Sequence, residues 1–388
     1  MRFEFATAAR IVFGPGAVAE LGTVAAPLGR RALLVTGRHA ERAAAARGAL
    51  AGAGVAVVPF PTAGEPTVDT VRQGVSAARA GGVDVVVACG GGSAIDAGKA
   101  VAALLGNGGD PLDYLEVVGR GQPLAKPSFP FVAVPTTAGT GSEVTRNAVL
   151  ASPEHGLKAS LRSPLMLARA AIVDPDLLVG LSPPVVAASG LDAFAQLVEP
   201  FVSLRANPVV DGLCREGLAR SARSLRRAFE GDASSSVRVD LALASLFGGL
   251  ALANAGLGAV HGFAAPVGGL FDAPHGAACA ALLPAVLRVN LRALGQRRPQ
   301  SPALARYREV AAIVTGRPDA GAEDAVAWVE ALVRSLSVPG LSRWGATEGD
   351  VERLVAKARA ASSMKGNPIE LNEGELAEIA RASLVVVR

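Results

Sequence analysis

Two of the four histidines in this sequence lie in apolar, glycine-rich surroundings, where an imidazole needs a specific partner. His261 lies within GAVHG and His275 within DAPHG. A buried imidazole must satisfy both ring nitrogens, and a metal ion or a substrate oxygen is a common partner. Upstream, Asp192 and Gln196 are spaced to share one face of a predicted helix. Asp192, His261 and His275 would together make a three-ligand site for a divalent metal with room for a substrate oxygen, while two core histidines satisfied by ordinary partners are the alternative.

A run of three glycines, Gly90-Gly91-Gly92, marks a second place where chemistry is expected. The β-branched run Val83–Cys89 before it predicts a buried strand of a parallel sheet, and a helical pattern follows from Ala94. Ser93 occupies the predicted N-cap, and Asp96 gives the spacing of a capping box. Bare backbone N–H groups and the positive end of a helix dipole then meet at one spot, which favours an anion such as a pyrophosphate. The alternative is an ordinary tight turn. Because the pattern is neither G-x-G-x-x-G nor a P-loop, the class of nucleotide stays open at this point.

A loop rich in hydroxyl side chains follows another predicted strand, over residues 129–134. Its segment PTTAGTGSE contains Thr136, Thr137, Thr140 and Ser142, which offer donors to a second part of a nucleotide. The alternative is a polar turn, but this loop would fall on the same edge of the sheet as the glycine run. We add Lys158, further along the chain, to the residues expected to bind the cofactor.

The elements that must position these residues alternate between strand and helix in the first half of the chain. Strands are predicted over 31–36, 55–60, 83–89, 129–134 and 171–174, with helices over 17–28, 41–51 and 68–80, and residues 2–13 predict a β-hairpin or an edge strand. Short connections between them indicate a doubly wound parallel sheet with its ligand at the carboxyl ends of the strands. From about Pro183 onward every long segment has a helical pattern. We therefore expect an α/β domain over residues 1–180 and an all-helical domain over 181–388.

Composition excludes several classes of protein. Half of the residues are hydrophobic and 19% are charged, so a large packed core is expected rather than disorder. The net charge is +4, and the basic residues of 215–227 recur at helical spacing with few aromatics, which indicates a solvated helix face rather than a nucleic-acid surface. Three widely spaced cysteines fit free thiols in a reducing compartment. The amino terminus does not have the pattern of a signal peptide, and we expect a cytoplasmic protein.

One stretch has the length of a membrane span. Residues 241–271 contain no Asp, Glu, Lys or Arg. They also contain many glycines and His261, and Pro266 interrupts the run, while the aromatic and basic flanks of a membrane helix are missing. We interpret this stretch as buried helices that crowd a site.

Five motifs, in chain order, resemble those of the iron-containing (group III) alcohol dehydrogenases, a superfamily that includes the maleylacetate reductases. They are GGGSAIDAGKA, PTTAGTGSEVT, SGLDAFAQLVE, NAGLGAVHGFAAPVGG and DAPHGAACAALLP. The resemblance runs from end to end and includes SSMKGNP at residues 362–368. It implies a dehydroquinate synthase-like fold: an N-terminal dinucleotide-binding domain, a helical C-terminal domain, and NAD(P) and a metal in a cleft between them. It also implies dimers or larger assemblies, and we expect a homodimer.

Two positions depart from the family pattern. The family's metal ligands are one Asp and three His. Asp192, His261 and His275 match, but the histidine expected four residues after the Asp is Gln196. A further histidine, expected four residues after His261, is Ala265. An amide oxygen is a poorer ligand than imidazole for Fe²⁺ or Zn²⁺, so we expect the metal to be weakly held or absent.

The leading function is an NAD(P)-dependent oxidoreductase that moves a hydride between nicotinamide and a small alcohol or its aldehyde or ketone. Asp192, His261 and His275 would polarise the substrate oxygen, with or without Gln196 and a metal. One alternative is a metal-independent carbonyl or maleylacetate-type reductase in which a histidine supplies the proton. Another is a nucleotide-binding protein that has lost catalysis.

The cofactor preference is predicted from the end of the RALLVT strand. Where NAD-preferring dehydrogenases often place an acid for the ribose 2′-hydroxyl, this chain has Gly37 followed by Arg38. No carboxylate repels a 2′-phosphate there, so NADP is slightly favoured over NAD. The expected partner is a small-molecule alcohol or carbonyl compound, with neither nucleic acid nor membrane.

Overall fold

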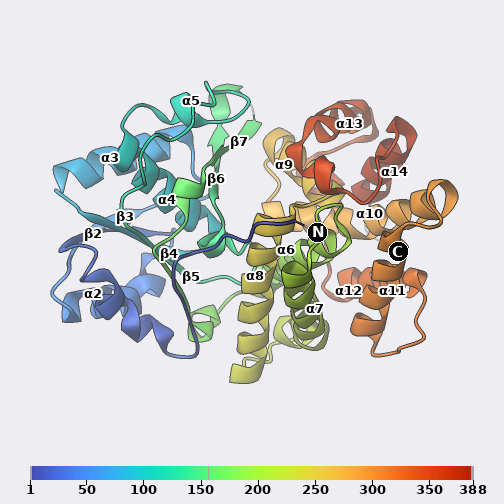
Figure 1. Cartoon of the computed structure of the whole chain (residues 1–388), viewed down its shortest axis with the longest axis horizontal. Helices are drawn as coiled ribbons and strands as arrows, with labels where there is room; N and C mark the ends of the chain where they lie inside the picture. Colours follow the sequence, from blue (N-terminus) through green and yellow to red (C-terminus); the bar gives the residue numbers. More distant parts are fainter. Residues whose placement is uncertain (1, 156, 386–388) are drawn as a thin grey trace. The chain divides into compact units, whose positions relative to one another are not determined.

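The computed structural model describes residues 2–155 and 157–385 of the chain, which divides into two compact units (Figure 1). The first unit comprises Ala6–Thr137 and Gly141–Val179. The second takes in the described residues from Gly180 onward, together with Ala138–Thr140 and the described part of the segment Met1–Phe5.

The first unit is built on a parallel sheet of six strands in the order β1-β8-β5-β4-β2-β3. The strands are β1 (Ile11–Phe13), β2 (Arg31–Thr36), β3 (Ala56–Pro61), β4 (Val85–Gly90), β5 (Phe131–Pro135) and β8 (Ala170–Val173). The helices of this unit are α1 (Leu21–Ala25), α2 (Ala44–Gly52), α3 (Val68–Ala80), α4 (Gly92–Asn107) and α5 (Pro111–Tyr114). From β2 the chain moves outward to β3 and then returns to β4 on the other side of β2. The order of strands therefore reverses between β2 and β4, which is where doubly wound sheets bind their ligands.

Helices cover both faces of this sheet because its central strands are apolar on both sides. Figure 1 shows α2 on one side of the strands and α3 and α4 on the other. Leu34, Val87 and Val134 pack toward α1 and α2 in one buried cluster. On the opposite face, a Cβ at Gly98 of α4 would lie 2.8 Å from that of Ala88, so this glycine allows the helix to approach β4 closely. The predicted fold class, a parallel α/β domain followed by an all-helical domain, is confirmed.

The amino-terminal segment forms an edge strand rather than a hairpin. Ile11–Phe13 alone is β1, and it pairs in parallel with β8. The hairpin alternative is therefore wrong. Before Ile11, Ala9 N still donates to Ala168 O and Arg10 O accepts from Ala171 N, so this part of the segment runs beside β8 and not beside a hairpin partner.

The start of α4 also differs from the prediction. The helix begins at Gly92, with Gly91 as an extended N-cap residue (φ −71°, ψ −178°) that makes no side-chain cap. Ser93 therefore lies in the first turn, and the predicted capping box of Ser93 and Asp96 is wrong. The Asp96 carboxylate instead accepts hydrogen bonds from Ser142 Oγ at 2.5 Å and from Val149 N at 2.9 Å. Bonds to the following loop have replaced the local bond that sequence spacing predicted.

A buried lysine ties that loop to α4. Lys99 is 1% exposed, and its Nζ donates to Ser142 O (2.8 Å), Thr145 Oγ1 (2.8 Å) and Asn147 O (2.5 Å). The loop then enters an antiparallel pair of strands, β6 (Asn147–Ser152) and β7 (Leu157–Arg162).

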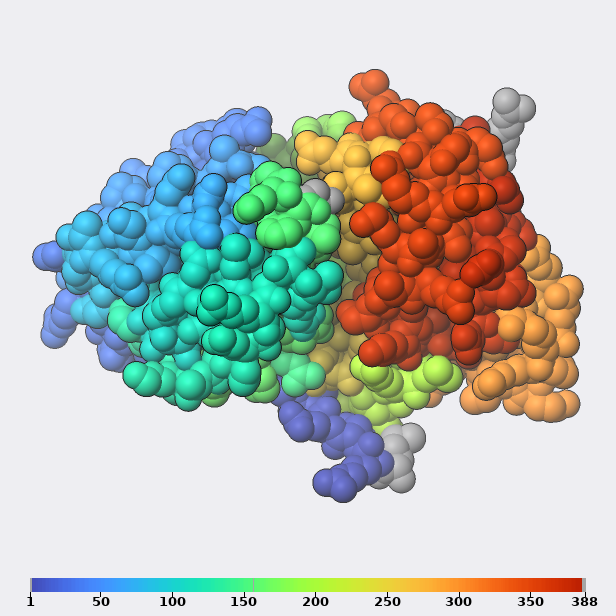
Figure 2. All heavy atoms as spheres, turned by 90° about the horizontal axis from the view of Figure 1, so that it is seen from above, coloured from blue at the N-terminus to red at the C-terminus, as the bar shows by residue number. Residues whose placement is uncertain are grey.

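The second unit is helical throughout its long elements. They are α6 (Pro183–Val202), α7 (Pro208–Phe229), α8 (Ser235–Ala255), α9 (Ala259–Phe271), α10 (His275–Arg297), α11 (Pro302–Thr315), α12 (Ala322–Ser335), α13 (Val351–Ala360) and α14 (Glu373–Leu384). In the space-filling view, the elements after α10, in orange and red, form one contiguous part of the surface of this unit (Figure 2).

The apolar stretch over 241–271 forms most of α8 and all of α9. The break falls at Gly256, where φ is 72°, and not at Pro266, which lies inside α9. Three helices, α6, α8 and α10, are long and apolar enough to cross a membrane by length and composition alone. In this fold 78%, 61% and 89% of their apolar windows are buried, so their apolar side chains serve mainly as core.

Candidate active site

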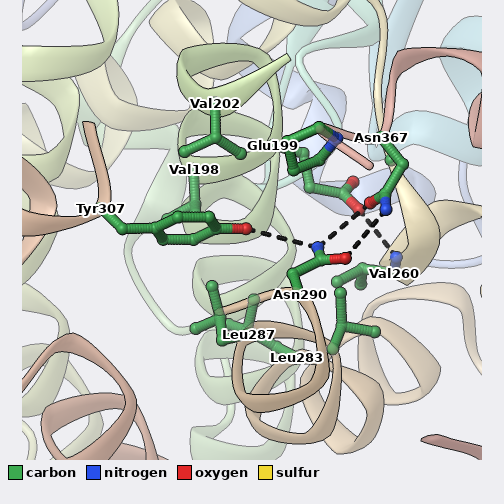
Figure 3. Close-up of a pocket in the computed structure, with 12 residues that line it drawn as sticks. Val198, Glu199, Val202, Val260, Leu283, Leu287, Asn290, Tyr307 and Asn367 are labelled. Atoms are coloured by element: carbon green, nitrogen blue, oxygen red, sulfur yellow. Dashed lines mark hydrogen bonds between the residues drawn. The ribbon is translucent and has the colours of Figure 1, made fainter. Parts of the chain in front are cut away.

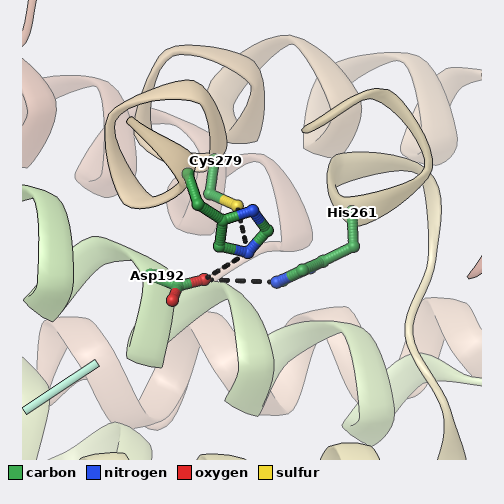
Figure 4. A group of neighbouring side chains, drawn as sticks. Asp192, His261 and Cys279 are labelled. Carbon is green, nitrogen blue, oxygen red and sulfur yellow. Dashed lines mark hydrogen bonds and ion pairs between the residues drawn. The ribbon is translucent and has the colours of Figure 1, made fainter. Parts of the chain in front are cut away.

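Four ligand-type side chains meet in the helical unit (Figure 4). His261 Nε2 lies 3.2 Å from Asp192 Oδ1, His275 Nε2 lies 3.7 Å from the same oxygen, and Cys279 Sγ lies 3.7 Å from His275 Nε2. One ligand atom from each of the four residues lies within 4.8 Å of the others. The structure therefore brings together the three predicted residues and adds a thiol.

Three helices supply this cluster. Asp192 lies in the middle of α6, and His261 lies in the first turn of α9. Between α9 and α10 the chain turns at Asp272, whose left-handed conformation (φ 52°) is tolerated by Asp better than by most residues. This short turn makes His275 the first residue of α10 and places Cys279 one helical turn later, so both project toward the same point.

Glu199 fixes the position and the tautomer of His261. It is 5% exposed, its Oε1 accepts from Val260 N at 2.7 Å, and its Oε2 lies 2.6 Å from His261 Nδ1. One carboxylate thus caps the start of α9 and holds the proton on Nδ1, which leaves Nε2 to face Asp192. A ligating histidine commonly has such a partner on its other nitrogen.

A network of buried amides lies beside this carboxylate and bonds to the start of the same helix (Figure 3). Asn290 and Asn367 exchange two hydrogen bonds, of 3.1 and 2.8 Å. Asn367 Oδ1 also accepts from Ala259 N at 3.2 Å, and Asn290 Nδ2 lies 3.3 Å from Tyr307 Oη. Together with Glu199 these residues line a cavity of about 10 Å³. The first backbone N–H groups of α9 are therefore held by two side chains from distant segments, Glu199 and Asn367, which fixes the direction of His261.

Without a cation, the Asp192 carboxylate and the two imidazoles stabilise each other's charged forms. Burial opposes ionisation of Asp192, but the two imidazoles and a hydrogen bond from Gln196 lower its pKa to about 2. Burial also opposes the charge on His261, but Cys279 and Glu199 hold its pKa well above the ordinary value. Attraction to the Cys279 sulfur, opposed by partial burial and aided by Asp192, raises the pKa of the half-exposed His275 to about 9. Protons on these imidazoles would have to leave before a metal binds.

The two positions that depart from the family pattern have different surroundings. Gln196 is 2% exposed and lies one turn after Asp192. Its Oε1 has no hydrogen-bond partner among the described residues. Ala265 lies on α9 and is exposed. Its methyl group cannot take the part of the imidazole that the family pattern has there.

The residues predicted to bind a nucleotide gather at the carboxyl edge of the sheet. Thr36 of β2 pairs with Cys89 of β4, and Gly90 pairs with Pro135 of β5, so the three strand ends are adjacent. A Cβ at Gly90 would lie 3.2 Å from Gly37 N, and one at Gly91 would lie 3.3 Å from Thr137 Oγ1. Gly37, Gly90-Gly91-Gly92 and Thr136-Thr137 therefore form one continuous edge at the start of α4. Its first N–H groups lack partners within the helix.

Other predicted cofactor residues make bonds inside the fold. Asp96 and Ser142 bond to each other, and Lys158 forms an ion pair with Glu65. Arg38 is exposed just beyond β2. Thr140 is placed with the helical unit. The side chains of Asp96, Ser142 and Lys158 are therefore engaged within the protein. They are better placed to stabilise the loops than to contact a nucleotide.

Sequence reasoning missed Cys279 and Glu199. Both lie in quoted motifs, Cys279 four residues after His275 and Glu199 seven after Asp192, so helical spacing was the signal that could have found them. Cys279 was interpreted only as a free thiol, and all three cysteines are indeed free and buried.

Comparison with known proteins gives the family. Residues 8–175 match the profile described as iron-containing alcohol dehydrogenase, and residues 186–384 match the C-terminal profile of Fe-containing alcohol dehydrogenases. The 1,3-propanediol dehydrogenase of Citrobacter freundii is 36% identical over 382 residues, which cover 95% of each chain.

Two solved structures extend this likeness to the fold. That of a 1,3-propanediol oxidoreductase matches with a TM-score of 0.90 at 34% identity, covering 99% of this chain and 100% of the other. That of sulfoacetaldehyde reductase from Bifidobacterium kashiwanohense, in complex with NAD⁺, matches with a TM-score of 0.87 at 26% identity and covers 99% of each chain.

These matches define an oxidoreductase that acts on alcohols. The chain belongs to the iron-containing alcohol dehydrogenase family. The resemblance seen in the sequence motifs is confirmed.

Proposed function

We propose that this protein is an NAD(P)-dependent alcohol dehydrogenase that interconverts a small alcohol and its aldehyde or ketone. The observation that carries the proposal is the buried group of Asp192, His261 and His275, in a family whose members are dehydrogenases. A nicotinamide, when bound, gives or takes the hydride, and a divalent cation, when bound, withdraws charge from the substrate oxygen.

The residues of the helical unit fit a cation. Asp192 supplies a carboxylate that stays ionised, and the two Nε2 atoms lie within 4 Å of its Oδ1. Glu199 keeps the His261 proton on the far nitrogen, and a hydrogen bond from Gln196 helps to hold the Asp192 carboxylate in its charged form. Three such ligands with an open position are the usual arrangement of a catalytic metal site.

His275 marks the side from which a substrate can approach. Its side chain is 39% exposed, against 6% for His261 and 2% for Asp192. The substrate oxygen would therefore meet His275 before the two deeper ligands. This imidazole would orient the oxygen whether or not a cation is present.

In the α/β unit we assign the glycine edge to the cofactor's pyrophosphate. Gly90-Gly91-Gly92 and the start of α4 offer N–H groups, and Thr136-Thr137 offer hydroxyls beside them. Gly37 and Arg38 follow the neighbouring strand and leave room for a 2′-phosphate, so NADP(H) is expected at least as readily as NAD(H). On this assignment residues 1–180 form the nucleotide domain and residues 181–388 the metal and substrate domain. A homodimer in the cytoplasm remains our expectation.

The relatives support small oxygen-bearing substrates. One is named for 1,3-propanediol and another for sulfoacetaldehyde. We therefore propose a short alcohol or its carbonyl counterpart as the first class to test.

The test is turnover of NADPH or NADH with a panel of short aldehydes, and the reverse reaction with the alcohols. His275→Ala should lower kcat by at least about 100-fold, the scale on which a positioned acid or electrophile contributes. His155→Ala is the matched control, since that histidine lies in a surface turn beside Ser152. Full activity in His275→Ala would place the chemistry elsewhere.

Chelation separates the remaining alternatives. Activity that is lost after dialysis against a chelator and restored by Zn²⁺ or Fe²⁺ supports the metal-dependent dehydrogenase. Activity that survives complete metal removal supports the metal-independent carbonyl or maleylacetate-type reductase. No turnover with any substrate, together with intact NAD(P)H binding, would indicate a nucleotide-binding protein that has lost catalysis.

A further inference from the structure

We propose that Cys279, and not Gln196, is the fourth protein ligand of the metal, so that the site is built from one carboxylate, two imidazoles and one thiolate. This inference rests on the metal site of the proposed function. It changes the expectation of a weakened site, which considered only the loss of an imidazole at position 196.

The distances fit a tetrahedral site. Bonds of about 2.0–2.3 Å to Zn²⁺ place neighbouring ligand atoms about 3.3–3.8 Å apart in a tetrahedron. Three of the ligand-to-ligand distances are 3.2 Å between Asp192 and His261, 3.7 Å between Asp192 and His275, and 3.7 Å between His275 and Cys279. All four ligand atoms stay within 4.8 Å of one another. The four ligand atoms can therefore surround a cation with little movement, and a substrate oxygen would add to them as a fifth ligand, an expansion that catalytic zinc sites allow.

Cys279 is placed by the same helix that places His275. The two residues are one turn apart on α10, and Cys279 is fully buried. The other two cysteines, Cys89 in β4 and Cys214 in α7, are equally buried but do not belong to this cluster. Burial alone therefore does not explain why a thiol is directed toward two imidazoles and a carboxylate.

Gln196 directs the N–H end of its amide, and not the oxygen, toward the cluster. Its side chain donates a hydrogen bond to Asp192, while Oε1 lies on the side of Gly248 of α8, 3.7 Å from where a Cβ on that glycine would be. An amide that donates to the carboxylate in this way cannot also direct its oxygen at the cation. Gln196 then orients Asp192, and the fourth ligand comes from α10.

A thiolate changes the chemistry of the site in two ways. It is a soft ligand, and sulfur with imidazole favours Zn²⁺ or Co²⁺ over Fe²⁺. It also adds a second negative charge to that of Asp192, so a divalent cation becomes fully neutralised. With three imidazoles and one carboxylate the same site would keep one positive charge.

The experiment is a Co²⁺ titration of the apoprotein followed by absorbance. Wild type should bind one Co²⁺ per chain and show the near-ultraviolet charge-transfer band of a thiolate–cobalt bond. Cys279→Ser should lose the band and at least about 100-fold in affinity, more than the 10- to 100-fold that loss of an outer hydrogen bond costs. Cys214→Ser is the matched control and should keep both. Unfolding of each apo variant, followed by circular dichroism, shows that the fold is retained.

A double variant tests the exchange of ligands directly. Gln196→His with Cys279→Ser should restore tight Co²⁺ binding without the charge-transfer band. Gln196→Ala alone should keep the band. A wild-type protein that binds Co²⁺ without the band, or a Cys279→Ser variant of unchanged affinity, overturns the assignment of Cys279. Failure of wild type to bind any divalent cation overturns the metal in the proposed function itself.

Discussion

Glu199→Gln should weaken metal binding without removing any ligand. The substitution is nearly isosteric, and the Gln carbonyl can still accept from Val260 N, which Glu199 now accepts at 2.7 Å. The other terminal atom, 2.6 Å from His261 Nδ1, changes from an acceptor to an N–H donor. His261 must then carry its proton on Nε2, the nitrogen that faces Asp192, or give up the bond altogether.

The size of the effect follows from that tautomer. The Nε2–H tautomer of His261 cannot ligate a metal. Metal binding would then require either the less favourable Nδ1–H tautomer or the loss of the buried hydrogen bond between His261 and residue 199. Outer partners of ligating histidines contribute about 10- to 100-fold in metal affinity, which corresponds to about 1.4–2.7 kcal/mol. We expect Glu199→Gln to lie in that range and Glu199→Ala to exceed it, because the alanine also removes the cap from α9.

The assay is metal affinity by competition with a chromophoric chelator. Asp240→Asn is the matched control: that carboxylate is 6% exposed and pairs with Arg220 and Arg223 outside the cluster. It should lower the melting temperature and leave metal affinity unchanged. A Glu199→Gln protein with wild-type affinity would show that the tautomer of His261 is not set by Glu199.

Two further predictions concern the α/β unit. Arg38→Ala should lower kcat/KM for NADPH by about 10- to 100-fold, the scale of one charge-assisted bond to phosphate, and leave NADH unchanged. Arg47→Ala, at an exposed position of α2, is its control, and a strong wild-type preference for NADH would contradict the role given to Gly37 and Arg38. Glu143 is 3% exposed, and burial, partly offset by a backbone hydrogen bond and by Lys99, raises its pKa from 4.5 to about 7. Between these two pH values the folded protein keeps a proton on Glu143 that the unfolded chain releases. The contribution of Glu143 to the free energy of unfolding is therefore complete below pH 4.5, and about 3 kcal/mol of it is lost as pH rises through 7. Glu143→Gln should raise the apoprotein's melting temperature relative to wild type at pH 8 and much less at pH 4.5, and an equal difference at both would refute the assignment.

Local sequence patterns predicted the sheet well because its strands are apolar runs between clear turns. The strand over 31–36 and the helix over 68–80 have the predicted bounds. The start of α4 was misplaced because three glycines carry little information about which of them is the N-cap. Asp96 has the spacing of a capping residue, but its tertiary partners, Ser142 and Val149, lie about fifty residues away and override that local preference.

The site was harder to predict because its members are brought together by tertiary contacts. Asp192, His261 and His275 stood out through residue type and resemblance. Cys279 did not, since a cysteine in an alanine-rich helix has the composition of core. Its role depends on the close approach of α6 and α10, which periodicity within one helix does not reveal.

The contacts of Lys99 bear on the thermodynamics of cofactor binding. Its ammonium reaches two acceptors in the segment between β5 and β6 and a third at the first residue of β6, each within 2.8 Å, from a helix whose first turn forms the glycine edge. The loop beside that edge is thus ordered before any nucleotide arrives, and little conformational entropy is left to lose on association. Binding through this edge should behave as capture by a rigid surface, with fast association and with amide hydrogen exchange in residues 142–147 that is already slow in the free protein.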